Sequence, residues 1–324
     1  MTMPRTLARA MAASVLLLSG FAASEQPDWE ASRMELPLVQ VGPHTWVVLG
    51  RLEEASAANE GFIANAGFVI GDDGVVVYDT LGSPALADRM IREIRRLTDR
   101  PIRLAVVGHY HADHFYGIPA LRAAGAAIWA DDAARLYLNS EAGEARLAER
   151  RAQIGRYLGN DFSLPLPDRW ITADEEFEMA GVQFALHRLG PAHSPDDLAL
   201  LVKPDGVLFS GDLVYSGRVP FIGEANTRQW LDSLDRMLGI PATVMVPGHG
   251  PISREPQRDA QLTRDYLRFL RQKMGEAVAN FESFDEAYTR IDWSRFSEVP
   301  TFDAANRQNA YSVFLEMEQE FLAR

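Results

Sequence analysis

Residues 102–117 read IRLAVVGHYHADHFYG, and this stretch carries most of what the sequence says about fold and chemistry. It opens with a short apolar run, 102–107, which predicts a buried strand. A His-rich turn follows at once, and Gly117 precedes a segment with helical spacing. The turn therefore lies at the carboxyl end of a strand, which is where α/β architectures present functional groups.

The turn carries the pattern H-x-H-x-D-H, formed by His109, His111, Asp113 and His114. Side chains alternate in direction along extended backbone, so His109 and His111 point the same way and can hold one metal ion. Asp113 and His114 come where the chain turns and can reach a second ion nearby. Imidazole and carboxylate ligands of this kind suit Zn²⁺, with Fe or Mn as alternatives.

Three further segments, each containing a glycine, offer one metal-competent side chain apiece close to the end of a predicted strand. These side chains are His193, Asp212 and His249. A single His is more often a hydrogen-bonded structural residue than a ligand, but the joint pattern reverses that expectation. His44 and His187 lie outside the pattern, and we interpret them as ordinary polar positions of strands.

Composition limits the kinds of protein this chain can be. Its 324 residues, 47% hydrophobic and 24% charged, predict one large or two modest folded domains. A net charge of −13 argues against nucleic acid or an anionic membrane surface as a partner. The absence of Cys excludes disulfides, thiolate catalysis and Cys-ligated metal. Any metal site must therefore be built from His and carboxylates.

Hydrophobic periodicity predicts alternating strands and helices. The predicted strands cover 44–49, two runs within 67–78, 102–107, 126–130, 182–189, 198–202, 207–210 and 243–246. The predicted helices cover 83–98, 118–124, 131–158, 227–238, 255–274 and 304–322. We interpret the acidic run 174–176 as a solvated turn and Arg135, Arg146 and Arg150 as a solvated helix face. The loops 50–62 and 215–226 are the candidates for substrate contacts.

The first 24 residues predict a secretory signal peptide. Arg5 and Arg9 form a basic start, an apolar run covers 10–18, and Ala22-Ala23-Ser24 provides a cleavage site. The apolar run is shorter than the ~20 residues that span a bilayer. We therefore expect an exported protein, periplasmic in a Gram-negative source, with no membrane contact in its mature form. Residues 25–37 are expected to form a linker.

The ligand-bearing segments occur in the order typical of metallo-β-lactamase-fold hydrolases, and about residues 38–275 resemble that superfamily. The resemblance implies an α/β architecture, the αβ/βα four-layer sandwich, followed here by a C-terminal helical extension over 276–324. It implies a first Zn²⁺ held by His109, His111 and His193. It implies a second held by Asp113, His114 and His249, with Asp212 bridging both. Asp79 matches the strand-end Asp that braces the metal loop through hydrogen bonds.

Two shorter stretches give a narrower resemblance. Residues 192–197 and 211–230 look like the quinoprotein relay system zinc metallohydrolases (SoxH-like), which are exported proteins. Residues 223–227, together with Trp230, also resemble the B1-type β-lactamases. In that class a Cys stands where this chain has Asp212, and a carboxylate-binding Lys stands where it has Tyr215. Arg218 could supply the missing positive charge for a substrate.

The resemblance implies an exported binuclear zinc hydrolase acting on a small-molecule substrate. Two Zn²⁺ ions lower the pKa of a shared water to about 7, so metal-bound hydroxide can attack an ester, thioester or amide carbonyl, β-lactams included. Asp113 would orient this nucleophile as the catalytic residue. A processing nuclease fits poorly, because the chain lacks a basic surface.

Two alternatives stay open at this point. The first is an iron-dependent oxidoreductase on the same fold, of the persulfide dioxygenase or flavodiiron kind. The second is a non-catalytic periplasmic accessory protein stabilised by its metal. The second alternative conflicts with the size of the ligand set, because structural zinc sites are usually closed and four-coordinate.

Overall fold

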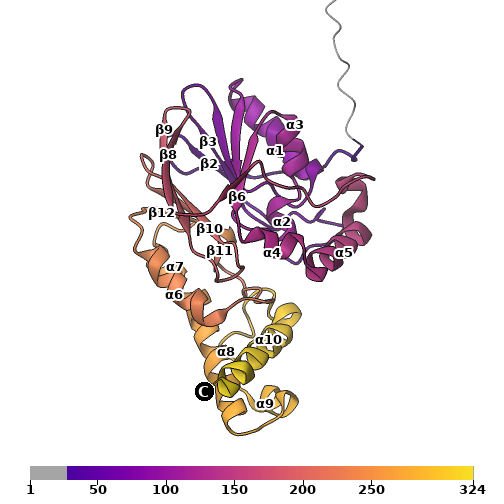
Figure 1. The fold of residues 1–324 in the computed structure, drawn as a ribbon, viewed down its shortest axis with the longest axis vertical. Coiled ribbons are helices and arrows are strands. Elements are labelled where there is room, and N and C mark those ends of the chain that lie inside the picture. Colours follow the sequence, from indigo (N-terminus) through magenta and orange to yellow (C-terminus); the bar gives the residue numbers. More distant parts are fainter. Residues whose placement is uncertain (1–27, 324) are drawn as a thin grey trace, which may run out of the picture.

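The computed structural model describes residues 28–323. Two β-sheets face each other, and helices cover their outer sides (Figure 1). This arrangement confirms the predicted αβ/βα sandwich. The predicted signal peptide and the start of the predicted linker lie outside the described residues.

The first sheet has seven strands in the order β1-β2-β3-β4-β5-β6-β7. They are β1 (Leu38–Gln40), β2 (Thr45–Val48), β3 (Ala66–Ile70), β4 (Val75–Tyr78), β5 (Ile102–Val106), β6 (Ala127–Asp131) and β7 (Arg169–Ile171). Strands β1 to β4 pair antiparallel, and β4 to β7 pair parallel. Parallel pairs need crossovers, which the helices of this half provide.

The second sheet has five strands in the order β12-β11-β10-β9-β8. They are β8 (Glu175–Met179), β9 (Val182–Arg188), β10 (Leu198–Val202), β11 (Val207–Tyr215) and β12 (Val244–His249). Only the β11–β12 pair is parallel among the pairs that the structure describes in this sheet. The carboxyl ends of β11 and β12 therefore meet at one edge, and the β9–β10 turn lies at that same edge.

The helices form two groups. The first half contains α1 (Pro84–Leu97), α2 (Ala112–Phe115), α3 (Ile118–Ala123), α4 (Ala134–Leu138) and α5 (Glu141–Leu158). The second half contains α6 (Thr227–Leu238), α7 (Pro256–Asp259), α8 (Gln261–Ala279), α9 (Phe284–Arg290) and α10 (Phe302–Leu322). Of these helices, all within residues 28–323, none is long and apolar enough to cross a membrane.

Three apolar cores hold the layers together. The core between the sheets contains Val76, Leu104, Phe184 and Phe209, all buried. A second core lies between the first sheet and α1 to α5, and a third lies between the second sheet and the C-terminal helices. Because each sheet is covered on both faces, strands such as β4, β10 and β11 are buried at every position, as their continuous apolar runs predict.

Two local predictions were wrong. The segment 131–158 is interrupted at Ser140, whose side chain accepts a hydrogen bond from Gly143 N at 3.1 Å and caps a new helix, α5. The acidic run 174–176 leads into strand β8, which pairs with β9 at the edge of its sheet. There Glu176 and Glu178 point to solvent while Phe177 packs on Phe184, so the alternation of a half-buried strand explains the acidic residues.

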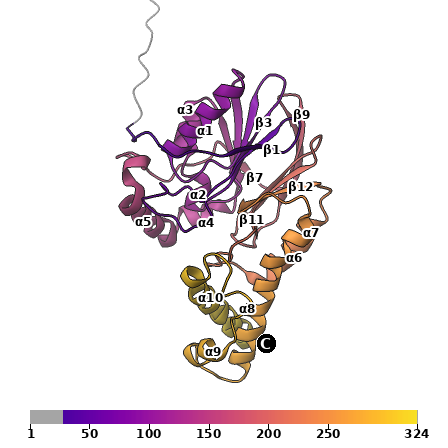
Figure 2. The same cartoon turned by 180° about the vertical axis from the view of Figure 1, so that it is seen from behind.

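The described part of the predicted linker lies against the domain. Leu36 and Ser32 are buried, and Glu30 N donates a hydrogen bond to the Arg156 carbonyl at 2.8 Å. At the other end, α8 continues through the predicted boundary at residue 275 and packs against α10. The C-terminal helices project from one end of the sandwich (Figure 2).

A cluster of charged side chains fastens α10 to α6 and α8. Glu316 and Glu320 of α10 accept hydrogen bonds from Arg271 of α8 at 2.9–3.0 Å. Glu316 also accepts from Thr227 N, at the first residue of α6, and Glu320 accepts from Arg228 Nε at 3.0 Å. We call these five residues the α10 clamp. A carboxylate at the N-terminus of α6 is favourable for the helix dipole.

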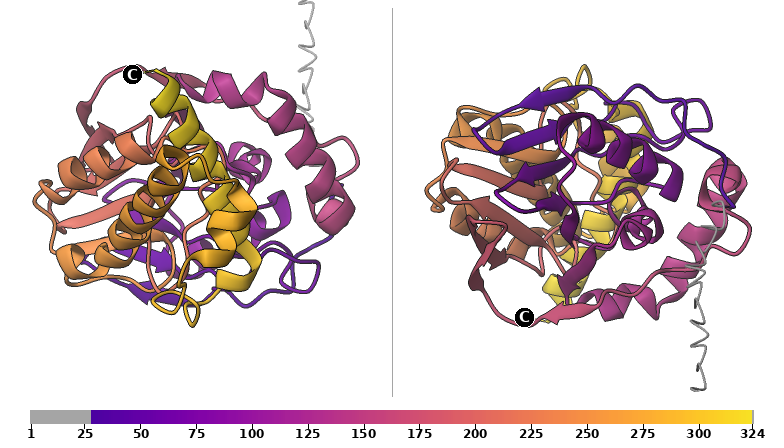
Figure 3. Two further views of the ribbon diagram at one scale, coloured as in Figure 1. Left: turned by 90° about the horizontal axis from the view of Figure 1, so that it is seen from below. Right: turned by 90° about the horizontal axis from the view of Figure 1, so that it is seen from above.

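The extension also holds the loop that follows β11. The buried Asn309 of α10 donates to the Pro220 carbonyl at 2.7 Å and accepts from Ile222 N at 3.0 Å. Seen from below, the extension lies across the end of the sandwich, and the helices of residues 134–158 curve round one side (Figure 3, left). The extension thus fixes a loop that the sequence marks for substrate contacts.

Candidate metal centre

The fold brings all seven predicted ligands to one edge of the sandwich. Their ligand atoms form two groups, within each of which the atoms lie no more than 4.8 Å apart. The first group is His109, His111, His193 and Asp212, and the second is Asp113, His114 and His249. His44 and His187 belong to neither group, as predicted; His44 instead pairs with Asp205 at 2.7 Å.

In the first group, three imidazole nitrogens converge on one point. His111 Nδ1 lies 3.0 Å from His109 Nε2 and 2.9 Å from His193 Nε2. In a tetrahedral zinc site with Zn–N bonds of 2.0–2.1 Å, ligand nitrogens are about 3.3 Å apart. The distances between these three nitrogens are therefore close to those between nitrogens bound to one zinc ion. It also shows that His109 and His111 use different ring nitrogens, which residue spacing could not predict.

In the second group, Asp113 Oδ2 lies 3.3 Å from His249 Nε2 and 3.6 Å from His114 Nε2. Asp212 reaches both groups. Its Oδ1 is 3.2 Å from His114 Nε2, and its Oδ2 is 3.3 Å from both His193 Nε2 and His249 Nε2. Asp212 therefore faces ligand atoms of both groups.

The cluster is incomplete as a hydrogen-bond network. His114 Nε2 and Asp212 Oδ1 are buried and face each other at 3.2 Å without forming a hydrogen bond, and neither has any other hydrogen-bond partner among residues 28–323. Burying an unpaired polar atom costs about 1–3 kcal/mol, so native proteins rarely leave one without a reason. The donor set of imidazoles and carboxylates therefore fits two divalent metal ions.

Hydrogen bonds orient the ligands from behind. Asp79 Oδ2 contacts His114 Nδ1 at 2.8 Å, and its Oδ1 accepts from Gly108 N at 2.6 Å. These bonds hold Asp79 at a φ of 61°, which is unfavourable for a residue with a side chain. His249 Nδ1 donates to the Ile63 carbonyl at 2.9 Å. Such partners fix which ring nitrogen faces the metal.

Three supporting residues have roles that the sequence did not reveal. The Tyr215 hydroxyl donates to Asp212 Oδ2, and its ring stacks on His249 with centroids 4.9 Å apart. Asp196 accepts from Tyr110 N at 2.9 Å and so ties the His-rich turn to the β9–β10 turn. Asp197 accepts from Ser194 N and Oγ beside His193. Acidic pairs are common in solvated turns, so sequence alone gave no reason to expect these contacts.

Two glycines allow the close approach of β12 and its turn to the centre. A Cβ on Gly248 would lie 1.9 Å from Asp212 Oδ1. A Cβ on Gly250, which has a φ of 93°, would lie 1.7 Å from the Ser216 carbonyl oxygen. Both positions therefore exclude any larger residue.

Burial and mutual charge set the protonation of the cluster. Burial would raise the pKa of the Asp113 carboxyl, but the neighbouring His114 and His249 hold it well below its usual value. Burial raises the pKa of Asp196 to about 7, although hydrogen bonds from Ser194 and Tyr110 lower it. Asp113 is therefore a carboxylate at neutral pH, as a metal ligand must be.

The centre is open on one side. His111 and Asp113 are half-buried, whereas the other five ligands are buried. The two loops predicted to contact substrate lie near this region and are joined, since Arg218 Nη2 donates to Glu54 at 2.7 Å. The Arg218 guanidinium carbon is 5.9 Å from the Tyr215 ring centre. Its Nε and Nη1 are buried and have no hydrogen-bond partner within the described chain.

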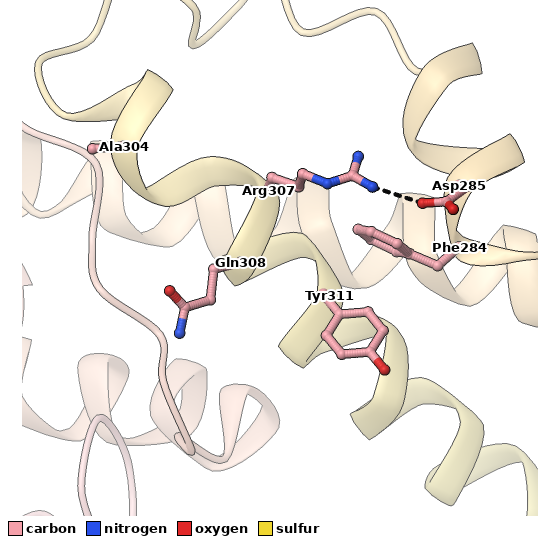
Figure 4. A pocket seen from close by; sticks show the side chains of 6 residues that line it. All are labelled: Phe284, Asp285, Ala304, Arg307, Gln308 and Tyr311. Carbon is pink, nitrogen blue, oxygen red and sulfur yellow. Dashed lines mark hydrogen bonds and ion pairs between the residues drawn. The ribbon is translucent and has the colours of Figure 1, made fainter. Parts of the chain in front are cut away.

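A separate hollow lies on the C-terminal extension (Figure 4). It lies between α9 and α10, and Arg307 pairs with Asp285 across it at 2.7 Å. Its lining residues are Phe284, Asp285, Ala304, Arg307, Gln308 and Tyr311. None of them belongs to either ligand group, so this hollow is not part of the metal centre.

Comparison with known proteins agrees with the geometry. The family model of the Metallo-beta-lactamase superfamily matches residues 59–249. The probable metallo-hydrolase YqgX of Bacillus subtilis is 29% identical over 194 residues, which is 58% of this chain and 85% of that protein.

Two other curated relatives are longer proteins. The linear primary-alkylsulfatase of a Pseudomonas strain is 24% identical over 61% of this chain and 44% of its own length. The 2,4-dinitroanisole O-demethylase subunit alpha of a Nocardioides strain is 26% identical over 55% of this chain and 50% of its own length. The chain thus spans about half the length of these two relatives.

Solved structures share the fold. A metallo-beta-lactamase from Pontibacter korlensis aligns with a TM-score of 0.57 at 20% identity, covering 72% of this chain and 99% of that one. The sec-alkylsulfatase Pisa1 of a Pseudomonas strain aligns with a TM-score of 0.64 at 19% identity, covering 87% of this chain and 50% of that one.

Proposed function

The chain belongs to the metallo-beta-lactamase superfamily, and from that premise we propose that it is an exported binuclear zinc hydrolase of small molecules. The bond cleaved is that of an ester, a thioester or an amide, and β-lactams are among the amides to be tested. The observation that carries the proposal is Asp212, a buried carboxylate that faces histidines of both ligand groups. One fold hosts many chemistries, so the argument rests on this site rather than on the fold.

The chain's own residues have separable roles in such a reaction. Zinc held by the two ligand groups would supply hydroxide at neutral pH and a Lewis acid for the scissile carbonyl. Asp113 is a half-buried carboxylate at the open side, so it can accept a hydrogen bond from the attacking water and orient it. Tyr215 holds Asp212 in position through its hydroxyl. Arg218 Nε and Nη1 are buried without a partner among residues 28–323, so they can donate to a polar group of the substrate.

The narrower assignment follows from the sequence. We propose membership of the quinoprotein relay system metallohydrolases because residues 192–197 and 211–230 resemble that group. We propose export to the periplasm because residues 1–24 have the pattern of a signal peptide. N-terminal sequencing of the protein from its native host tests this, since a mature chain that retains residues 1–24 would contradict it.

An iron-dependent oxidoreductase is the second candidate function. All seven ligands are imidazole or carboxylate, and such a set also suits iron. Metal analysis of protein purified from its native host separates the two. Two equivalents of zinc per chain support the hydrolase, and iron without zinc supports the oxidoreductase. A purely structural metal conflicts with the open side at His111 and Asp113.

The direct test is turnover by the zinc-loaded protein, with metal content measured on the same sample. A chromogenic cephalosporin, 4-nitrophenyl acetate and a thioester cover the proposed bonds. An alkyl sulfate belongs in the same panel, because two of the related proteins are named alkylsulfatases. Asp113→Asn should lose activity while the chain stays folded. Full activity of Asp113→Asn with both metals bound would overturn the role given to Asp113.

A further inference from the structure

Helices α4 and α5 bring unexpected side chains to the open side of the metal centre. The ring of Tyr137, from α4, lies edge-on to the ligand His111 with centroids 5.8 Å apart. Phe221, from the loop after β11, lies edge-on to the same ligand at 6.3 Å. The Arg146 guanidinium carbon, from α5, lies 5.9 Å from the Phe221 ring centre. Arg146 is therefore not simply part of a solvated helix face, as its sequence context suggested.

Two phenol groups in this part of the fold, Tyr116 and Tyr137, lack hydrogen-bond partners among residues 28–323. Tyr116 is fully buried just after α2, and Tyr137 is half-buried. Their hydroxyl oxygens are both buried, and no group within residues 28–323 hydrogen-bonds to either. A buried hydroxyl without a partner destabilises a fold, so two together indicate that something else accepts from them.

Helix α5 packs against α2 and α4, the helices next to the two phenols. Arg146 and Arg150 are four residues apart in α5 and therefore share one face of that helix. A phenol has an ordinary pKa of about 10, so both hydroxyls keep their proton at neutral pH and can donate hydrogen bonds. We call Tyr116, Tyr137, Arg146 and Arg150 the phenol subsite.

The arginines of the subsite are only weakly neutralised. Arg146 pairs with Glu149 at 2.6 Å, but the side chains are 34% and 46% exposed, and such surface pairs contribute little. Arg150 donates to the neutral side chain of Gln153 at 2.8 Å. In a chain with a net charge of −13, two such cations beside two free hydroxyl donors form a local positive site.

We propose that the phenol subsite binds an oxyanion carried by the substrate, a carboxylate or a sulfate group. Charged N–H and phenolic O–H donors are the usual partners of such an anion. Tyr137 and Phe221 then contact the apolar part of the substrate beside His111. The substrate class is an anionic ester, thioester or amide with an apolar or aromatic portion. This inference rests on the proposed function, because the subsite acts by orienting the substrate at the metal centre.

The kinetic test compares two esters that differ in one charge. The zinc-loaded protein is assayed with neutral 4-nitrophenyl acetate and with mono-4-nitrophenyl succinate, whose acyl group carries a carboxylate. Arg146→Met and Tyr137→Phe should lower kcat/KM for the succinate about tenfold relative to the acetate, mainly through KM, because a charge-assisted hydrogen bond is lost. Zinc content should stay unchanged in both variants.

Arg156→Met is the matched control. It removes one positive charge from the same helix, but Arg156 is 61% exposed and lies against Glu30 and Tyr157 instead of the metal centre. It should leave the succinate-to-acetate ratio unchanged. An equal change of that ratio in Arg146→Met and Arg156→Met would overturn the subsite, since only net charge would then matter.

A binding measurement separates failure of the subsite from failure of the proposed hydrolysis. The zinc-loaded protein is titrated calorimetrically with sodium phenylacetate and with sodium phenyl sulfate, which share a ring and differ in the oxyanion. Weaker binding to Arg146→Met and Tyr137→Phe than to Arg156→Met supports the subsite, even if neither ester is hydrolysed. Equal affinities in all three variants overturn it. The tighter of the two anions identifies the oxyanion.

Discussion

The metal centre and the α10 clamp are both clusters of part-buried charge, yet they differ in one respect. In the clamp, Glu316 and Glu320 are matched by Arg271, Arg228 and Thr227, so each carboxylate has several donors. In the metal centre, seven side chains converge, and buried His114 Nε2 and Asp212 Oδ1 have no hydrogen bond within residues 28–323. A cluster that satisfies itself stabilises a fold. A cluster that does not is arranged for something it binds.

The largest effect is expected at the residue that joins the two ligand groups. Asp212→Ala removes a carboxylate that faces four of the histidines. Because a direct ligand is lost, zinc affinity should fall more than the roughly 10–100-fold typical of a lost supporting residue. Zinc content after dialysis, together with turnover, measures this. Two tightly bound zinc ions in Asp212→Ala would show that Asp212 does not bridge.

A smaller loss is expected at Asp79, which touches the metal centre only through His114. Asp79→Asn weakens a hydrogen bond that orients a ligand, and zinc affinity should fall about 10–100-fold. Competition with a chromophoric chelator measures the affinity. Asp205→Asn is the matched control, because Asp205 pairs with His44 at 2.7 Å away from both ligand groups. Equal zinc affinities in the two variants would contradict the role of Asp79.

Breaking the clamp should affect stability and leave metal binding intact. Arg271→Met leaves two part-buried carboxylates with fewer donors, and we expect the free energy of unfolding to fall by about 1–2 kcal/mol. For a chain of this size that corresponds to a decrease in Tm of a few degrees, roughly 2–6 °C. Calorimetry and zinc analysis are made on the same sample. An unchanged Tm together with a reduced zinc content in Arg271→Met would contradict the assignment of the clamp to stability rather than to metal binding.

The smallest effect is the pH dependence of the clamp. Hydrogen bonds from Arg228, followed by those from Arg271, lower the pKa of Glu320 to about 2. A lowered folded-state pKa adds stability above the unfolded value of about 4.3, and that stability is lost as the pH falls towards 2. The stability difference between the wild type and Glu320→Gln should therefore be constant above about pH 5 and shrink below it. Denaturant unfolding in the presence of a chelator keeps metal release out of the measurement. A difference that grows at low pH would contradict this sign.

Much of the fold was predictable because its signals are local. Short apolar runs and helical spacing predicted most strands and helices, including β5 and α6. Strand β8 was missed because its outward-facing residues are acidic and its alternation covers only five residues. The break between α4 and α5 depends on Ser140, whose capping hydrogen bond is visible only in the structure.

The contacts around the substrate side could not be predicted in the same way. Asn309 holds the backbone of the loop at Pro220 and Ile222, although it lies on the last helix. Arg218 reaches Glu54 from the far half of the chain. No periodicity in the sequence links such positions, because they meet only after the two sheets have packed.

The sequence by itself predicted the sandwich, through its resemblance to a known superfamily, and the seven side chains that the structure brings together, because these lie in short motifs at or near the ends of apolar strand runs. Only the tertiary structure decided that Asp212 faces both groups, that Tyr215 holds it, and that the hydroxyls of Tyr116 and Tyr137 have no hydrogen-bond partner within the described residues. The physical reason is the range of the interactions. Backbone geometry places side chains within one segment, whereas hydrogen-bond satisfaction in a buried site depends on which distant segments supply the partners.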